Sequence, residues 1–289
     1  ERIFGMQPRL RRLKYRMSEF SDQVAVITGG ANGIGQALAR ALAARGVKVA
    51  IADINDTLGE NLAAEINAAG GSAKYLHVDV TVEESMSALM AEVKREFGRL
   101  DLVFNNAGIS VAGDGRDLTL DQWRKVTDVN YWGVIYGCKF AYDLMAEQGS
   151  GHIINIASLA GLIPFPTNLP YSATKFAVVG LSMSLRAEGA DLGVNVSCVC
   201  PGFIASNIYE ATEMVNVPKK AIIDNIPFRI VSTEVAAERI LNGVRKNKAI
   251  IIFPGYAKLF WGLYRLKQSL LNTFALQTIR DLRKLRGKS

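Results

Sequence analysis

Seven short apolar segments, separated by longer stretches of helical period, run through most of this chain of 289 residues. They are rich in Val and Ile and span residues 23–28, 47–53, 73–79, 100–106, 152–158, 194–200 and 248–253. Helical period recurs between them, at residues 35–45, 56–69, 82–97, 120–148, 171–190 and 233–246. Apolar strands that alternate with helices are typical of a parallel sheet covered on both faces. The sequence therefore predicts an α/β fold with a doubly wound, seven-stranded parallel sheet in one domain over residues 18–253.

Three segments fall outside this alternation. Residues 1–17 are basic and are expected to be an N-terminal arm, either native or left from expression. Residues 203–232 follow the sixth strand, and inserts in that place often serve as lids over a substrate. Residues 254–289 are expected to be an amphipathic helical C-terminal extension. Its apolar side chains recur at intervals of three and four residues, at Leu259, Leu263, Leu266, Leu270 and Phe274.

The net charge of +7 is concentrated at the two ends of the chain. Residues 1–17 carry six Arg or Lys against one Glu, and residues 254–289 carry eight against one Asp, which leaves −5 for residues 18–253. A nucleic-acid enzyme needs its basic surface on the folded body, so this distribution argues against nucleic acid as a partner. For the extension, the preferred interpretation is packing on its own domain or on a partner subunit. The alternative is peripheral contact with an anionic lipid surface.

Cysteine and histidine usage is sparse, with three Cys and two His. There is no CxxC pair and no metal-ligand spacing, so we expect no metal site and three reduced, mostly buried thiols. The first seventeen residues lack the long apolar core of a secretory signal. No window reaches the ~18 uncharged apolar residues that a membrane span requires. These features favour a cytoplasmic protein.

A glycine-rich turn follows the first predicted strand, in the sequence Thr28-Gly29-Gly30-Ala31-Asn32-Gly33-Ile34-Gly35. Glycines at 29, 33 and 35 permit a sharp turn, a close approach of the backbone to a pyrophosphate, and tight packing of helix on strand. The spacing G-xxx-G-x-G is weak evidence by itself, because a purely structural turn can look the same. Its place between the first strand and the first helix favours a Rossmann-type dinucleotide site.

The second predicted strand ends at Asp53, eighteen residues after Gly35. A carboxylate there can accept hydrogen bonds from a ribose 2′-hydroxyl and repels a 2′-phosphate. Residues 29–36 contain no Arg or Lys that would bind that phosphate. NAD is therefore preferred over NADP. The alternative is that Asp53 is a helix N-cap, although Asn55 and Asp56 could serve equally well.

Tyr171 and Lys175 lie four residues apart in the sequence YSATK, so on a helix they share one face. A free phenol has a pKa near 10 and is a poor base at neutral pH. A nearby cation favours the phenolate and brings the phenol toward the pKa range in which it can act as an acid and a base. The alternative is a helix face that packs on a neighbouring subunit.

Over residues 22–253 the chain resembles the short-chain dehydrogenase/reductase family, because seven motifs occur in that family's order. They are TGGANGIG at 28–35, Asp79 in HVDV, NNAG at 105–108, Asn130 in DVNYWG, Ser158 in NIASLAG, YSATK at 171–175 and PGFIAS at 201–206. Ser206 stands where the family often has Thr and keeps the hydroxyl.

The resemblance implies a set of residues around the cofactor. Asp79 and Val80 would contact the adenine region, and Asn106 to Gly108 would steady the cofactor beside the fourth strand. Pro201 and Gly202 would lie near the nicotinamide, and Ser206 would offer its hydroxyl to the carboxamide. With the phosphate loop and Asp53, the expected cofactor-binding residues are Gly29, Asn32, Gly33, Ile34, Gly35, Asp53, Asp79, Val80, Asn106, Ala107, Gly108, Tyr171, Lys175, Pro201, Gly202, Ile204 and Ser206.

The expected catalytic residues are Asn130, Ser158, Tyr171 and Lys175. Tyr171, its pKa lowered by Lys175 and the oxidised nicotinamide, would take the alcohol proton while hydride leaves the same carbon. Ser158 would hold the substrate oxygen. Lys175 would also hold the nicotinamide ribose, and the resemblance assigns Asn130 to a water that links Lys175 to solvent.

The expected function is NAD-dependent interconversion of a lipophilic secondary alcohol and its ketone. The segments expected to line the substrate pocket, 108–114, 159–169 and 203–232, are mostly apolar. An NADPH-dependent reductase of the 3-oxoacyl type and a non-catalytic dinucleotide sensor are the alternatives. The resemblance also implies a homodimer or homotetramer.

Overall fold

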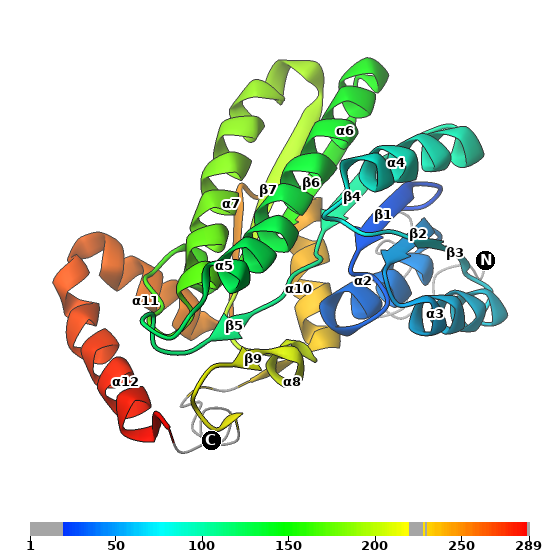
Figure 1. Cartoon of the computed structure of the whole chain (residues 1–289). Helices are drawn as coiled ribbons and strands as arrows, with labels where there is room; N and C mark the ends of the chain where they lie inside the picture. Colours follow the sequence, from blue (N-terminus) through cyan, green and yellow to red (C-terminus); the bar gives the residue numbers. More distant parts are fainter. Residues whose placement is uncertain (1–19, 220–227, 229, 288–289) are drawn as a thin grey trace, which may run out of the picture.

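A seven-stranded parallel sheet forms the centre of the computed structural model, which describes residues 20–219, 228 and 230–287 (Figure 1). Its strand order is β11-β7-β6-β4-β1-β2-β3. The seven strands coincide with the seven apolar segments, so the predicted fold is confirmed. They are β1 Val24–Thr28, β2 Lys48–Asp53, β3 Ser72–His77, β4 Leu102–Asn105, β6 Gly151–Ile156, β7 Val194–Pro201 and β11 Ile250–Phe253.

The central strands are mostly apolar because both faces of the sheet are covered. In β1, Ile27 packs in the core on one face while Val26 packs in the core on the other. Phe104 and Val103 of β4 divide between the two cores in the same way. Burial of a side chain of this size stabilises a fold by about 1.5–3 kcal/mol, so every position of these strands contributes.

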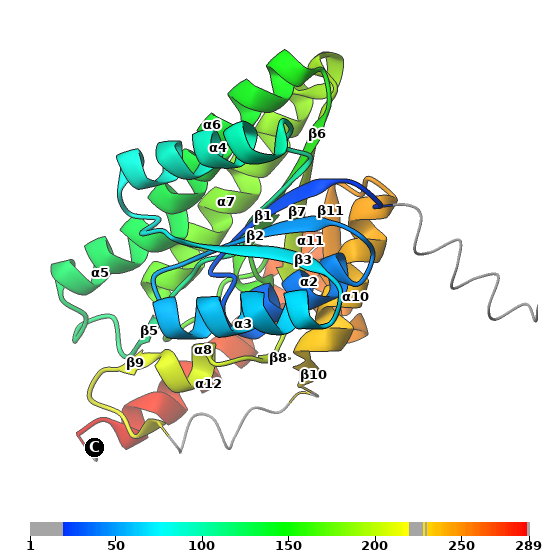
Figure 2. The same cartoon turned by 90° about the vertical axis from the view of Figure 1, so that its right-hand side faces the viewer.

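Helices lie on both faces of the sheet (Figure 2). Three of them, α2, α3 and α10, contribute to the core on one face, and α4, α6 and α7 contribute to the core on the other. Their bounds are α2 Gly33–Ala43, α3 Asp56–Ala68, α4 Glu83–Phe97, α6 Gly133–Gln148, α7 Leu169–Glu188 and α10 Thr233–Arg245.

The helical stretch predicted at residues 120–148 is not a single regular helix. It consists of α5 (Leu120–Thr127), a π-helical turn at Asp128–Trp132, and α6. Single π-helical turns of this kind occur frequently at functional sites. This one contains Asn130.

The insert after β7 forms two small sheets, one between its own two ends and one with a distant segment. Strand β8 (Ile204–Ala205) pairs with β10 (Val231–Ser232), and β9 (Glu213–Met214) pairs with β5 (Val111–Ala112). A short helix, α8 (Ile208–Ala211), lies between β8 and β9. Part of the predicted lid, residues 220–227 and 229, falls outside the described residues, as does the predicted arm at 1–17.

The C-terminal extension is helical, as predicted, and packs on its own domain. It comprises α11 (Gly255–Leu266), a 3₁₀ turn at Gln268–Leu271 and α12 (Asn272–Leu285). Ala257 of α11 is buried in a small apolar cluster with Leu159 and Ile163. Among the described residues, no helix has the length and apolar character that crossing a membrane would require.

The predicted apolar stripe of the extension does not face the domain. Leu259 is 59% exposed and Leu266 is 82% exposed, and Leu270 is also exposed. A stripe at this spacing needs one continuous helix, but the 3₁₀ turn at 268–271 interrupts it. The apolar contacts with the domain come from Ala257, from aromatic side chains of α11 and from Leu271, and Leu282 of α12 is also buried.

Two ion pairs fix α12 to the loop that follows β5, and together we call them the clasp. The side chain of Asp114 is 2% exposed and accepts a hydrogen bond of 2.8 Å from Arg283 Nε. Asp117 accepts one of 2.7 Å from Arg286 Nε. Hydrogen bonds from Arg116 and from Arg283 hold the pKa of Asp114 well below its ordinary value. The clasp therefore stays ionised across the neutral pH range.

Candidate active site

The glycine-rich turn lies between β1 and α2, at the carboxyl end of the first strand (Figure 1). Asn32 is the N-cap of α2, and its Oδ1 accepts a hydrogen bond of 2.7 Å from Gly33 N–H. Ile34 and Gly35 lie in the first turn of the helix. The N-terminus of a helix attracts anions through its unpaired N–H groups and its dipole, so the turn is suited to a pyrophosphate.

The glycines of this turn have no room for a side chain. A Cβ on Gly35 would stand 2.2 Å from the carbonyl oxygen of Gly29, and one on Gly29 would stand 2.8 Å from Ala107 Cα. Gly29 and Gly33 also have φ values of +59° and +56°, a region that favours glycine. The turn is thus packed against the segment after β4, and its backbone is the surface left for a ligand. The residues present fit a dinucleotide.

Asp53 lies at the end of β2 and supports this turn directly. Its Oδ2 accepts a hydrogen bond of 3.0 Å from Ala31 N–H, and its Oδ1 accepts one of 3.1 Å from Asn55 N–H. The N-cap of α3 is Asn55, whose Oδ1 accepts the N–H of Leu58 at 3.0 Å. The interpretation of Asp53 as the helix cap is therefore wrong, and its carboxylate stands beside the phosphate loop.

Asn106 ties the phosphate loop to β4. Its Nδ2 donates to the carbonyl oxygens of Thr28 at 3.0 Å and Gly29 at 2.9 Å. The Thr28 hydroxyl accepts the N–H of Asn106 at 3.0 Å and that of Ala107 at 3.2 Å. Thr28 was not among the predicted site residues, although it opens the glycine motif and could have been identified there. Gly108 follows, and a Cβ on it would stand 3.3 Å from Asn130 Oδ1.

Tyr171 and Lys175 share one face of α7, as predicted. The Lys175 Nζ lies 5.4 Å from the centroid of the Tyr171 ring and donates a hydrogen bond of 2.8 Å to the carbonyl oxygen of Ile156. Lys175 is 3% exposed. Ile156 ends strand β6, so the ammonium group is held at the carboxyl end of the sheet.

The lowered pKa predicted for Tyr171 is not produced by the described residues. Burial raises the pKa of the Tyr171 phenol above its ordinary value, and the neighbouring Ser158 hydroxyl acts in the opposite direction. Burial also lowers the pKa of Lys175 to about 8. The reason is that both groups lie in an environment that disfavours charge. A lowering of the phenol pKa therefore requires a further positive charge beside it.

Ser158 follows the end of β6 and lies near Tyr171. Its hydroxyl accepts the N–H of Ala160 at 3.1 Å, which caps the short 3₁₀ helix at Leu159–Gly161, and it lies close enough to the Tyr171 phenol to act on the pKa of that phenol. The two hydroxyls thus lie side by side where β6 ends, as the sequence predicts.

Asn130 is fully buried in the π-helical turn. Its Oδ1 accepts the N–H of Ile109 at 2.8 Å, and its Nδ2 donates to the carbonyl oxygen of Ile109 at 2.9 Å and to the Thr174 hydroxyl at 3.4 Å. In the structure Asn130 therefore joins the segment after β4 to α7, next to Lys175. Its assignment to a water remains a prediction.

The remaining predicted cofactor residues lie on both sides of this centre. Asp79 Oδ1 accepts the N–H of Thr81 at 2.9 Å, and Val80 is buried against Gly133 at the start of α6. Pro201 ends β7 and is followed by Gly202 and Ile204. Ser206 lies against the phosphate loop, since its Cβ is 3.3 Å from a Cβ built on Gly33. The insert thus approaches the turn after β1.

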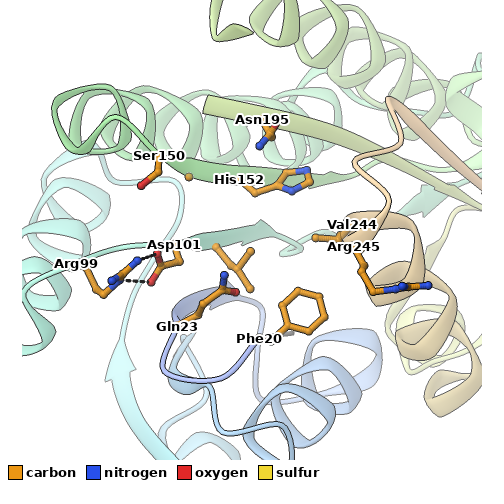
Figure 3. A pocket seen from close by; sticks show the side chains of 11 residues that line it. Phe20, Gln23, Arg99, Asp101, Ser150, His152, Asn195, Val244 and Arg245 are labelled. Atoms are coloured by element: carbon orange, nitrogen blue, oxygen red, sulfur yellow. Dashed lines mark hydrogen bonds and ion pairs between the residues drawn. The ribbon is translucent and has the colours of Figure 1, made fainter. Parts of the chain in front are cut away.

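A cavity of about 410 Å³ lies at the opposite edge of the sheet, where β1, β4, β6 and β7 begin (Figure 3). Arg99 pairs there with Asp101, whose carboxylate also accepts the N–H of Val24 at 2.9 Å. His152 lines the cavity, and burial lowers its pKa to about 4. Open α/β sheets bind ligands at the carboxyl ends of their strands. We therefore assign this cavity no part in the reaction.

Comparisons with known proteins agree with this geometry. The family model described as short chain dehydrogenase matches residues 23–215. The chain is 34% identical over 271 residues to the probable oxidoreductase EphD of Mycobacterium tuberculosis. The alignment covers 90% of this chain and 46% of EphD. The chain thus spans about half the length of that relative. It is 38% identical over 185 residues to the 2,5-dichloro-2,5-cyclohexadiene-1,4-diol dehydrogenase LinX of Sphingobium indicum, covering 64% of this chain and 74% of LinX.

A solved structure shows the same fold. The crystal structure of a short chain dehydrogenase/reductase from Burkholderia phymatum in complex with NAD has a TM-score of 0.81 and 26% sequence identity. It covers 87% of this chain and 96% of that chain. The fold predicted from the alternating segments is therefore shared with a dinucleotide-binding protein.

Proposed function

The chain belongs to the short-chain dehydrogenase family, and on this premise we propose that it is an oxidoreductase that interconverts a lipophilic secondary alcohol and its ketone with NAD. The observation that carries the proposal is the grouping of the Tyr171 phenol, the Ser158 hydroxyl and the Lys175 ammonium where β6 ends. It lies at the same edge of the sheet as the glycine-rich turn, where open α/β sheets bind their ligands.

The residues divide the reaction into proton transfer and positioning. A bound NAD supplies the hydride acceptor. Ser158 holds the substrate oxygen by a hydrogen bond, and Tyr171 takes the proton from that oxygen as the carbon loses hydride. In the reverse direction the Tyr171 phenol donates the proton to the carbonyl oxygen. Lys175 is held beside the phenol by the Ile156 carbonyl, and together with the positive charge of a bound oxidised nicotinamide it would favour the phenolate.

NAD is proposed over NADP because of Asp53. Its carboxylate lies at the end of β2 and is hydrogen bonded to the phosphate loop, so a 2′-phosphate near the loop would meet a negative charge. The related Burkholderia phymatum protein was crystallised with NAD. An NADPH-dependent reductase is the alternative, and comparative affinity for the two dinucleotides distinguishes them.

A lipophilic cyclic substrate is supported by the apolar character of the segments near Ser158. The segment after Ser158 carries the buried side chains of Leu159, Leu162 and Ile163, and in the insert the rings of Phe203 and Tyr209 stack on each other. The relative LinX is named for a cyclohexadiene diol, which is a cyclic secondary alcohol. Apolar surroundings favour ring and hydrocarbon groups over polyols.

We expect reduction of NAD with cyclic secondary alcohols and much less with polyols. The measurement is the absorbance of reduced nicotinamide with cyclohexanol, 2-octanol and sorbitol. We expect kcat/KM for cyclohexanol to exceed that for sorbitol by at least about 100-fold, the range that a few buried methylene groups produce. Faster turnover of sorbitol would overturn the substrate class. Binding of NAD with no turnover across a wide panel of alcohols and ketones would favour a dinucleotide sensor.

The assembly and location of the protein stay predictions. A homodimer or homotetramer is supported by large side chains that stand exposed on the helices near Asn130 and Tyr171, among them Trp132 and Phe176. A cytoplasmic location is in keeping with the three buried Cys.

Contact with an anionic lipid surface is proposed for the outward side of the extension. Leu259 and Leu266 are exposed there, and Lys258, Arg265 and Lys267 are exposed beside them. Leucines flanked by basic residues suit the interface of an anionic bilayer, where hydrocarbon and phosphate groups meet.

We expect the wild-type protein to sediment with phosphatidylserine-containing vesicles and the double variant Leu259→Gln/Leu266→Gln to bind at least about tenfold more weakly, since each leucine side chain contributes roughly 1.5–3 kcal/mol on burial. The matched control is Leu120→Gln, which removes an exposed leucine from α5. Equal sedimentation of the double variant and the control would contradict a lipid contact at this surface.

A further inference from the structure

Two residues that follow strand β7 are held by a tyrosine of the C-terminal extension. The backbone N–H of Phe203 donates a hydrogen bond of 2.7 Å to the hydroxyl of Tyr256, at the start of α11. The same hydroxyl lies against Gly202, because a Cβ built there would stand 2.5 Å from the Tyr256 oxygen. Position 202 must therefore remain glycine as long as Tyr256 keeps its place.

The Tyr256 ring also belongs to a group of stacked aromatic side chains between α11 and the insert. Its centroid lies 4.9 Å from that of Phe228, which stacks on Phe203 at 5.6 Å. Phe260, one turn further along α11, meets Phe228 edge to face at 5.3 Å. These arrangements are the favourable ones for aromatic pairs. We call Phe203, Phe228, Tyr256 and Phe260 the aromatic wall.

The aromatic wall extends to the proposed acid–base residue. Tyr209 stacks on Phe203 with 6.4 Å between the ring centroids, and its hydroxyl accepts the N–H of Ile204 at 3.2 Å. Tyr209 also lies near enough to Tyr171 for the charge of one phenol to affect the pKa of the other. The extension is thus linked to the neighbourhood of Tyr171 through the stacked rings of Phe203 and Tyr209.

Both ends of the extension are fixed to the substrate side of the domain. Tyr256 holds the backbone that follows β7, and the clasp holds α12 to the loop that follows β5. The N–H of Gly287 adds a hydrogen bond of 3.0 Å to the carbonyl oxygen of Asn216, in the insert. Residues 254–287 therefore span the substrate side and are not a free tail.

We propose that the extension is part of the substrate site, that Tyr256 is a positioning residue for Gly202 and Phe203 beside the nicotinamide, and that the aromatic wall selects flat cyclic alcohols and ketones over open-chain ones. The proposal rests on the oxidoreductase function proposed above. It goes beyond that function because α11 lies outside residues 23–215, the part of the chain that the family model matches.

Two physical effects connect this wall to the reaction. A ring packs against aromatic faces with little loss of conformational freedom, whereas an open chain has to be ordered as it binds. Gly202 and Phe203 adjoin the expected nicotinamide position, and a displacement of about 1 Å between reacting groups can lower a rate roughly 100-fold. The Tyr256 hydroxyl is placed to prevent such a displacement.

The first test is Tyr256→Phe, which keeps the ring and removes the acceptor of the Phe203 N–H. We expect kcat for cyclohexanol to fall about tenfold, while the Kd for NAD changes less than about threefold, because the phosphate loop and Asp53 are untouched. The matched control is Tyr264→Phe, two turns further along α11, for which we expect wild-type kinetics. Wild-type kcat in Tyr256→Phe would overturn the positioning role.

The second test addresses the ring. In Tyr256→Leu the ratio of kcat/KM for cyclohexanol to that for 2-octanol is expected to fall about fivefold, since one aromatic face is lost. Equal losses for the two alcohols would overturn the selection of cyclic substrates.

Gly202→Ala combined with Tyr256→Phe should be no slower than Gly202→Ala alone, because both changes disturb the same contact. Additive losses would contradict that coupling.

Hydrogen exchange provides a readout that needs no turnover. The peptide segment that carries the Phe203 amide is expected to exchange faster in Tyr256→Phe than in the wild type or in Tyr264→Phe, because that amide loses its acceptor. Unchanged exchange would overturn the positioning role even if the wild type oxidised none of the alcohols, a result that would contradict the proposed function separately.

Discussion

Replacement of Tyr171 by Phe is expected to lower kcat for alcohol oxidation by about 10³–10⁴-fold, the upper range for a lost general acid–base group. The phenol lies near the Ser158 hydroxyl where β6 ends, close enough for Ser158 to act on the pKa of the phenol, so this oxygen is the one placed to exchange a proton with a substrate oxygen. Phenylalanine keeps the ring and its contact with Lys175 but removes that oxygen. The measurement is single-turnover formation of reduced nicotinamide with saturating NAD and cyclohexanol.

The loss should leave the binding of NAD nearly intact. The phosphate loop, Asp53 and Asn106 do not depend on the phenol, so the Kd for NAD from titration calorimetry is expected to stay within about threefold of the wild-type value. Tyr142→Phe, which removes a phenol from α6, is the matched control and should retain full activity. If Tyr171→Phe kept more than a small fraction of the wild-type rate, Tyr171 would not be the acid–base residue.

Replacement of Asp53 by Asn is expected to raise the preference for NADP relative to NAD by about 10- to 100-fold in kcat/KM, equivalent to roughly 1.4–2.7 kcal/mol. The carboxylate lies at the end of β2 and accepts the Ala31 N–H of the phosphate loop. Asparagine keeps one acceptor oxygen for that N–H and removes the negative charge that would oppose a 2′-phosphate. The measurement compares kcat/KM for the two dinucleotides at a saturating alcohol concentration.

Asp56→Asn is the control for this variant, because it removes a negative charge three residues later. Asp56 is exposed and hydrogen bonded to Tyr75 and His77. We therefore expect the Asp56→Asn variant to have the same cofactor preference as the wild type. A preference in Asp53→Asn no different from that in Asp56→Asn would mean that Asp53 does not select the cofactor.

The seven strands could be predicted because each strand's own sequence reflects its environment. Strands β1 and β4 are apolar except at their last residues, Thr28 and Asn105, since both faces of the sheet are covered, and such runs are visible without any knowledge of the partner strands. The glycine-rich turn could be predicted for a similar reason. Gly29 and Gly35 are required by close contacts inside a single strand–turn–helix unit.

The parts that could not be predicted depend on residues far apart in the chain. Tyr256 accepts a hydrogen bond from Phe203, 53 residues earlier, and nothing in the sequence near Tyr256 indicates that partner. The π-helical turn at Asp128–Trp132 lies inside a stretch of continuous helical period. It is supported by the bonds of Asn130 to Ile109 and Thr174, which are tertiary contacts.

The pKa of Tyr171 illustrates the same difference. The sequence places Lys175 one turn from the phenol, and proximity alone predicts a lowered pKa. Burial of both groups outweighs that attraction, because the pKa of Tyr171 rises and that of Lys175 falls to about 8. How deeply two neighbouring groups are buried is set by the whole fold and is not visible in their spacing.

The clasp has a consequence for biosynthesis. Arg283 and Arg286 contact Asp114 and Asp117, which are translated 169 residues earlier in each case. The sheet and the phosphate loop can form while translation is still under way, because domains fold as their elements leave the ribosome. The substrate side cannot be completed until helix α12 has emerged, so dinucleotide binding is expected to arise in the nascent chain before any discrimination between alcohols.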